Sequence, residues 1–269
     1  MKKIDLWPGR DTGVFRPFLE VNLLPDDKVR GAVVICPGGG YFKRSAHEGA
    51  PVAETFAAMG FHTFVLQYRV RPTRFPEPQQ DALRAIRIIR AHAAEWKVAP
   101  DKIAILGFSS GGHLAMSACT YYGLLDSTAG DEADQFSDKP DAGILCYPVI
   151  DVDGSRHGHA GSGIELCGGK IPTQEELYLY SLQFHVRSDM PPCFFWHTAE
   201  DRTVPAMNSI VMAQAMWNRN RPAELHIFPR GHHGLGLALD FPDIAKWPQM
   251  ASQFLHQLWY NESSCASLH

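Results

Sequence analysis

Three short segments hold side chains whose types and order suit nucleophilic catalysis. Ser109 is the centre of a Gly-x-Ser-x-Gly pattern at the end of an apolar run. His232 and His233 follow the last apolar run of the chain, and Glu200 and Asp201 follow the run before it. A serine hydroxyl becomes a nucleophile when a histidine takes its proton and an acidic side chain orients that histidine. The sequence therefore predicts a serine, a histidine and an acid that are assembled for acyl transfer.

The surroundings of Ser109 favour this interpretation over a glycine turn that only caps a helix. The run 102–108 predicts a strand, and the pattern over 110–122 predicts a helix. A sharp turn from strand to helix lifts its apex residue out of the sheet, beside the free N–H groups of the helix N-terminus. We expect Ser109 to be that residue. The backbone N–H of Ser110 is expected to help bind an oxyanion, whereas the Ser110 hydroxyl is expected to be of little consequence.

The residues alone leave alternatives open for the base and the acid. Either histidine of the pair can reach a serine at the same sheet edge, because both lie in a loop after a strand. The chain order serine, acid, histidine favours Glu200 or Asp201 as the acid, with Asp151 and Asp153 as fallback candidates.

A glycine-rich segment, "CPGGGY" at 36–41, follows the predicted strand 31–36. Its backbone can approach a substrate closely and offer N–H donors to an oxyanion. A phosphate-binding loop or a dinucleotide site is the rival interpretation, but the residues that complete those motifs are missing. His157 and His159 lack cysteine or carboxylate partners at ligand spacing, so we expect no metal site there.

Short apolar runs alternate with amphipathic ones along the chain, which predicts an α/β fold with a mostly parallel sheet and helices on both faces. The segment 18–24 is expected to be an antiparallel edge strand. Arginines 84, 87 and 90 recur at helical spacing and are expected to form a solvated helix face. The expected strands are 31–36, 62–68, 102–108, 142–147, 193–197 and 224–229, and the expected helices are 48–59, 79–96, 110–122, 207–218 and 244–260.

Two segments fall outside this alternation. The stretch 151–190 is long for a connection within a compact sheet, carries one or two short helical patterns, and is expected to form a lid or cap. The last nine residues, 261–269, are expected to be a flexible tail. We expect one domain over 1–269.

Composition excludes several classes of protein. The 269 residues are 45% hydrophobic with a formal net charge of −4, which gives no reason to expect nucleic acid or an anionic membrane as a partner. No apolar run approaches the roughly 20 residues of a membrane-spanning helix, and the N-terminal residues do not read as a secretion signal. Six cysteines without a Cys-x-x-Cys pair suggest reduced thiols and a cytoplasmic location. A homo-oligomer is left open.

Four motifs in this order resemble the α/β-hydrolase superfamily, most closely its bacterial esterase branch of acetyl xylan esterase-like and feruloyl esterase-like proteins related to hormone-sensitive lipase. They are "CPGGGY", "GFSSGGHLA", "WHTAEDRTVP" and "ELHIFPRGHHGLGLA". The resemblance implies an α/β-hydrolase fold with Ser109 as nucleophile, Asp201 as acid and His233 as base. For the oxyanion hole it implies the N–H groups of Gly39, Gly40 and Ser110, with Tyr41 as a further contributor, since Pro37 replaces the histidine of the relatives' H-G-G-G.

The resemblance also implies an activity. We expect a cofactor-free serine esterase that removes small acyl groups, in particular acetyl from acetylated xylo-oligosaccharides, through an acyl-enzyme. A feruloyl esterase, an arylformamidase or a small serine peptidase would use the same triad. A binding protein with a silent site is a remote alternative on the same fold.

Overall fold

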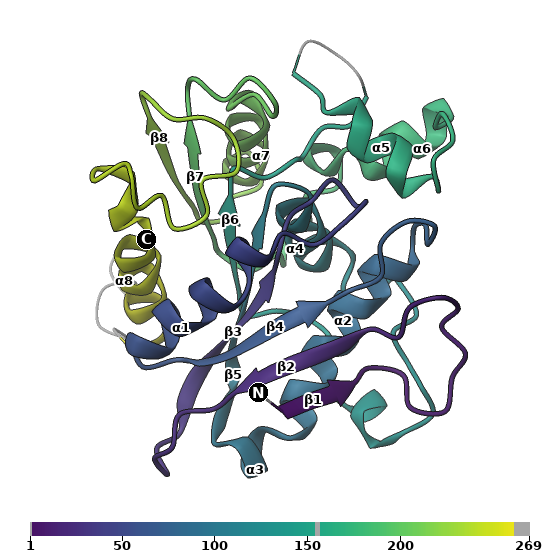
Figure 1. Ribbon diagram of the computed structural model, residues 1–269, viewed down its shortest axis with the longest axis vertical. Coiled ribbons are helices and arrows are strands. Elements are labelled where there is room, and N and C mark those ends of the chain that lie inside the picture. Colours follow the sequence, from purple (N-terminus) through teal and green to yellow (C-terminus); the bar gives the residue numbers. More distant parts are fainter. Residues whose placement is uncertain (1, 154–156, 261–269) are drawn as a thin grey trace.

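One eight-stranded sheet runs through the molecule in the order β1-β2-β4-β3-β5-β6-β7-β8 (Figure 1). The computed structural model describes residues 2–153 and 157–260. Strands β4, β3, β5, β6, β7 and β8 pair in parallel, and β1 and β2 add an antiparallel edge beside β4. The strands are β1 (Lys2–Asp5), β2 (Phe18–Asn22), β3 (Arg30–Cys36), β4 (His62–Gln67), β5 (Val98–Phe108), β6 (Ala142–Cys146), β7 (Cys193–Thr198) and β8 (Ala223–Phe228).

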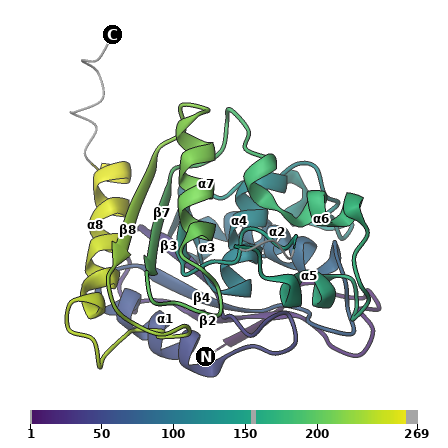
Figure 2. The same cartoon turned by 90° about the horizontal axis from the view of Figure 1, so that it is seen from above.

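Helices cover both faces of this sheet (Figure 2). Side chains of α1 and α8 belong to the buried cluster on one face, and those of α2, α3, α4 and α7 belong to the cluster on the other. The helices are α1 (Ala50–Ala58), α2 (Glu77–Ala91), α3 (Ala93–Trp96), α4 (Ser110–Tyr121), α5 (Ala160–Leu166), α6 (Gln174–Tyr180), α7 (Met207–Trp217) and α8 (Trp247–Tyr260).

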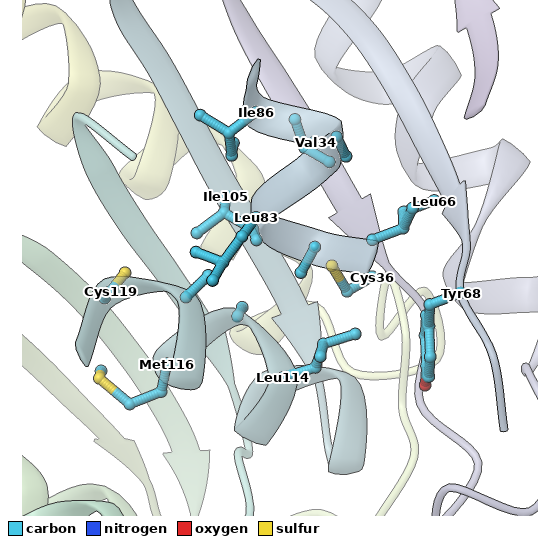
Figure 3. Close-up of a cluster of buried hydrophobic side chains, with 14 of the residues drawn as sticks. Val34, Cys36, Leu66, Tyr68, Leu83, Ile86, Ile105, Leu114, Met116 and Cys119 are labelled. Carbon is cyan, nitrogen blue, oxygen red and sulfur yellow. The ribbon is translucent and has the colours of Figure 1, made fainter. Parts of the chain in front are cut away.

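Burial on both faces explains why the strands are continuous apolar runs. In β3, Val34 and Cys36 point into the cluster beneath α2 and α4 (Figure 3). Their neighbours Val33 and Ile35 point into the opposite cluster. Each such aliphatic side chain contributes about 2 kcal/mol when it is removed from water. The central strands are therefore held firmly, and the loops at their carboxyl ends start from fixed positions.

The predicted elements agree with the structure apart from their boundaries, one additional strand and one predicted helix that is divided in two. The expected strands and the antiparallel edge segment 18–24 are present. Strand β1 was not predicted, because its sequence "KKID" is polar and short. The predicted helix 79–96 is two helices, since α2 ends at Ala91 and α3 begins at Ala93.

The expectation of a solvated arginine face on α2 is wrong. Arg84 is 1% exposed and pairs with Asp131 and Asp134 (2.9 Å to the latter). Arg87 and Arg90 likewise reach carboxylates of the acidic stretch that follows α4. The helical spacing does align the arginines. The acidic loop then folds back over them, and charge pairing compensates for the lost hydration.

The segment 151–190 lies on one side of the sheet and includes α5, α6 and the short 3₁₀ helix η3 (Leu182–Phe184) (Figure 1). The one or two short helices predicted there are thus present, whereas the function of the segment as a lid stays a prediction. Part of this segment, residues 154–156, and the expected tail 261–269 lie outside the described residues. In the described ranges the five cysteines are buried free thiols, and no helix there has the length and apolar character needed to cross a bilayer.

Candidate active site

Ser109 lies at the turn between β5 and α4, with backbone angles of φ 53° and ψ −120°. This left-handed conformation is costly for a residue with a side chain and is tolerated where the surrounding structure enforces it. The two flanking glycines allow the sharp turn. A Cβ on Gly107 would lie 2.0 Å from the carbonyl oxygen of Gly111, and one on Gly111 would lie 2.2 Å from that of Cys36. The sequence-based expectation for this turn is therefore met in its geometry.

The structure brings Ser109, His233 and Asp201 together. Ser109 Oγ is 2.8 Å from His233 Nε2, and His233 Nδ1 is 2.6 Å from Asp201 Oδ2. These residues follow β5, β8 and β7 respectively, and the carboxyl ends of parallel strands meet at one edge of the sheet. With Nδ1–H donated to the carboxylate, Nε2 is left to accept the hydroxyl proton of Ser109.

Asp201 is held in its charged form by its neighbours. It is 5% exposed, and its Oδ1 accepts the backbone N–H groups of Thr203 and Val204, each at 2.9 Å. Burial alone would raise the pKa of Asp201. Hydrogen bonds from His197 and His233 outweigh that effect and hold this pKa well below its usual range. A carboxylate kept ionised in this way can hold the His233 imidazole in one tautomer.

The remaining candidates for acid and base have other partners. Glu200 Oε2 accepts the N–H of Gly231 at 3.2 Å, and His232 Nδ1 lies 2.8 Å from the carbonyl oxygen of its neighbour His233. The fallback acid Asp151 accepts a hydrogen bond from Ser181 instead (3.1 Å). Of the candidate acids and bases, Asp201 and His233 are therefore the pair whose side chains connect to Ser109.

The glycine loop presents its N–H groups unequally. Gly38 donates to Glu48 Oε2 at 2.8 Å, and Tyr41 donates to Ser110 Oγ at 3.3 Å. Within the described residues, the N–H groups of Gly39, Gly40 and Ser110 have no hydrogen-bond acceptor. Those three N–H groups are accordingly available to bind an oxyanion, whereas the N–H of Tyr41 already has an acceptor. The buried Ser110 hydroxyl, expected to be of little consequence, is the acceptor that holds Tyr41.

A buried polar chain behind the glycine loop was missed by the sequence analysis. Gln79 Nε2 donates to Tyr41 Oη (3.3 Å). The carbonyl oxygen of Tyr180 can only accept, so His113 Nε2 donates to it (2.8 Å), and Nδ1 of the neutral ring accepts the hydroxyl proton of Tyr41 (2.8 Å). This order requires a neutral imidazole, and burial does lower the pKa of His113 to about 4. The chain ties the glycine loop to the end of α6.

His113 should make the stability of the protein depend on pH. Its pKa falls from 6.5 to about 4 on folding, so the unfolded chain binds more protons between these values. The free energy of unfolding should therefore drop by roughly 3 kcal/mol through this group as pH falls from about 6.5 to about 4. Urea titrations of the wild type and of His113→Gln across this range measure the effect. The glutamine variant should show the smaller pH dependence, and equal slopes would contradict the assignment.

His159, which belongs to the segment 151–190, interacts electrostatically with His233 and Asp201. This residue precedes α5, and its Nδ1 accepts the N–H of Ser162 at 3.2 Å. Burial lowers the pKa of His159, and the charge of His233 lowers it further. The two imidazoles are therefore close enough to interact electrostatically.

A mostly parallel sheet with a serine at the turn after a central strand, and an acid and a histidine after later strands, defines the class of α/β-hydrolases. The family model BD-FAE matches residues 22–216. The chain belongs to this family.

The chain is also similar to individual proteins and to solved structures. Endo-1,4-beta-xylanase B of Butyrivibrio fibrisolvens is 38% identical over 84% of this chain and 36% of its own length. The acetylxylan esterase of Xylanibacter ruminicola is 33% identical over 84% of this chain and 47% of its own length. The chain thus spans about a third to a half of these relatives. A crystal structure of an acetyl ester-xyloside bifunctional hydrolase from Caldicellulosiruptor lactoaceticus has 37% identity and a TM-score of 0.89, with 96% of each chain covered.

These comparisons confirm the predicted family and the α/β-hydrolase fold. The predicted class of enzyme, a carboxylic ester hydrolase, is the class that the names of the matched proteins carry, among them the acetylxylan esterase and the acetyl ester-xyloside hydrolase. The assignment of Ser109, His233 and Asp201 depends on the distances between their side chains.

Proposed function

We propose that this protein is a serine esterase that removes small acyl groups, in particular acetyl from acetylated xylo-oligosaccharides, through an acyl-enzyme. The observation that carries the proposal is the continuous hydrogen-bonded path from Ser109 Oγ through His233 to Asp201, with distances of 2.8 and 2.6 Å. A path of this length and order is what proton transfer from a serine hydroxyl requires.

The reaction follows from these positions. Ser109 Oγ attacks the ester carbonyl carbon while His233 Nε2 takes the hydroxyl proton, and Asp201 stabilises the imidazolium that forms. The oxyanion is bound by the N–H groups of Gly39, Gly40 and Ser110. His233 then gives its proton to the departing alcohol oxygen, and the acyl group stays on Ser109. A water molecule, deprotonated by His233, hydrolyses this ester and releases the acid.

The surface beside the base supports a hydroxyl-rich leaving group. An open hollow borders His233, and its lining includes Glu200, Arg202, Thr203 and His232. These side chains offer both hydrogen-bond donors and acceptors, which suits a sugar better than the aromatic ring of a ferulate. The names of the matched relatives, an acetylxylan esterase and an acetyl ester-xyloside hydrolase, point to the same substrate class.

Acetate release from acetylated xylo-oligosaccharides tests the proposal, in parallel with p-nitrophenyl acetate and p-nitrophenyl butyrate and with a feruloyl ester. We expect kcat/KM for the acetyl ester to exceed that for the butyryl ester by about tenfold or more, because two extra methylenes must fit the acyl site. Acetate should be released from the oligosaccharides.

Two results would redirect the proposal. Preference for the feruloyl ester would favour a feruloyl esterase with the same triad. Turnover of synthetic acetyl esters without any acetate release from the oligosaccharides would support the esterase activity but contradict the proposed xylo-oligosaccharide substrate.

A further inference from the structure

A buried carboxylate lies directly behind the glycine loop. Glu48 is 2% exposed, and its Oε2 accepts the N–H of Gly38 at 2.8 Å. A Cβ placed on Gly38 would lie 2.8 Å from Glu48 Oε2 and 3.0 Å from Ser109 Cβ, so the three residues pack against one another. Burying a carboxylate is costly unless its oxygens are hydrogen-bonded. The partners of this group are therefore informative.

The second oxygen of Glu48 reaches the loop that carries the base. Glu48 Oε1 accepts the hydroxyl proton of Tyr147 at 2.6 Å. The same hydroxyl oxygen accepts the N–H of Gly236 at 2.8 Å. The Tyr147 ring also meets the His233 imidazole edge to face, with centroids 5.1 Å apart. The Glu48 carboxylate thus connects the glycine loop, which carries the candidate oxyanion donors, to the loop that carries the candidate base His233.

His47 adds a second connection to the same loop. Its Nε2 is 3.0 Å from the carbonyl oxygen of Gly234, and a carbonyl oxygen only accepts, so Nε2 carries the proton. Gly234 directly follows His233 in the chain. The backbone that follows the candidate base is consequently held at Gly234 by His47 and at Gly236 by Tyr147, whose hydroxyl donates to Glu48.

We propose that Glu48 is a positioning residue for the ester hydrolysis proposed above, and the inference rests on that proposed function. Its carboxylate fixes the glycine loop 38–41 relative to the base loop 231–236, through Gly38 on one side and Tyr147 on the other. Because the Gly38 N–H is committed to Glu48, the next two N–H groups of the loop stay available to an oxyanion. Donors held in place before the reaction need no reorganisation in the transition state.

Only a carboxylate satisfies both partners at this position. A glutamine with its oxygen toward Gly38 would turn its NH₂ group toward Tyr147, whose hydroxyl proton would lose its acceptor. With the oxygen toward Tyr147, the NH₂ group would face the N–H of Gly38, and two donors would meet. In either orientation Glu48→Gln leaves one buried donor unpaired, although its size is unchanged.

The test compares Glu48→Gln with a matched control, Asp138→Asn. Asp138 is also a buried carboxylate that accepts one backbone N–H, from Gly123 (3.0 Å), and one hydroxyl, from Ser127 (2.9 Å), and in addition it pairs with Arg87 (3.3 Å). It lies beyond the end of α4 opposite to Ser109. Both variants are assayed for kcat and KM with p-nitrophenyl acetate, for inhibition by phenylboronic acid, and for unfolding in urea.

We expect Glu48→Gln to lower kcat by about 10- to 100-fold with KM changed by less than about threefold, because misplaced donors weaken transition-state binding most. The inhibition constant for phenylboronic acid, whose tetrahedral adduct uses the same donors, should rise by a similar factor. Asp138→Asn should be less stable in urea and keep its kcat.

A Glu48→Gln variant with lowered stability but unchanged kcat and inhibition constant would overturn the inference. If Glu48→Gln does not fold, Tyr147→Phe tests the inference instead. This variant keeps the Glu48 carboxylate and the aromatic ring but removes the hydroxyl that joins Glu48 to Gly236. A folded Tyr147→Phe with wild-type kcat and inhibition would also overturn it. Failure of the proposed function is distinguishable, because the wild type itself would then show no turnover that depends on Ser109.

Discussion

Replacing Ser109 by alanine is expected to lower kcat for p-nitrophenyl acetate by ~10⁴- to 10⁶-fold, the range seen when the nucleophile of such a triad is removed. The physical reason is that, among the described residues, the Ser109 hydroxyl is the one that hydrogen-bonds to His233 Nε2, at 2.8 Å. Without it, no acyl-enzyme forms, and only the donors of the glycine loop remain to polarise the ester. Steady-state kinetics and labelling by a fluorophosphonate probe measure the loss.

Ser110→Ala is the matched control for this experiment. Its backbone N–H is retained, and the lost hydroxyl removes the 3.3 Å hydrogen bond from Tyr41, which does not involve Ser109 or His233. Most activity and full probe labelling should therefore persist. An active Ser109→Ala enzyme, or a probe adduct found on Ser110, would refute the assignment of the nucleophile.

Replacing His233 by alanine is expected to have an effect of similar size, about 10⁴-fold or more in kcat, since the base and the nucleophile act as one unit. His233 is the imidazole that contacts both Ser109 Oγ and Asp201 Oδ2. Its loss leaves the serine hydroxyl protonated and the Asp201 carboxylate without the group it orients. Kinetics over pH 6 to 9 with p-nitrophenyl acetate provide the measurement.

The neighbouring His232 separates a local disturbance from loss of the base. His232 is exposed, and its ring contacts a backbone carbonyl and the Phe241 ring. His232→Ala should keep kcat within about threefold of the wild type, as expected for a surface change away from the reacting atoms. A dead His232→Ala enzyme together with an active His233→Ala enzyme would reverse the assignment.

Much of the site was predictable because it lies where strands end. The turn at Ser109 and the segments that hold Asp201 and His233 each follow an apolar run that is recognisable locally. Once these runs are known to be parallel strands of one sheet, their carboxyl ends must share an edge. The resemblance to known esterases then selected one residue from each segment, and the structure brings the selected residues together.

The supporting residues were not predictable in the same way. Glu48 and Tyr147 are separated by 99 residues, and Tyr147 and Gly236 by 89. Neither Glu48 nor Tyr147 stands in a recognisable pattern, and an acid before a helix is normally solvent-exposed. The prediction of a solvated arginine face on α2 was wrong for the same reason, because the acidic loop that covers these arginines comes more than 40 residues later in the chain.

The amino-acid sequence by itself determined the alternation of strands and helices, the sharp turn at Ser109 and the three segments that carry the candidate triad. These depend on local periodicity and on glycines that only a tight turn requires. The tertiary structure alone decided how closely Ser109, His233 and Asp201 approach one another, which N–H groups of the glycine loop are free, and which polar groups are buried together. Such choices depend on contacts between residues far apart in the chain, and those contacts exist only after the sheet has brought the loops to one edge.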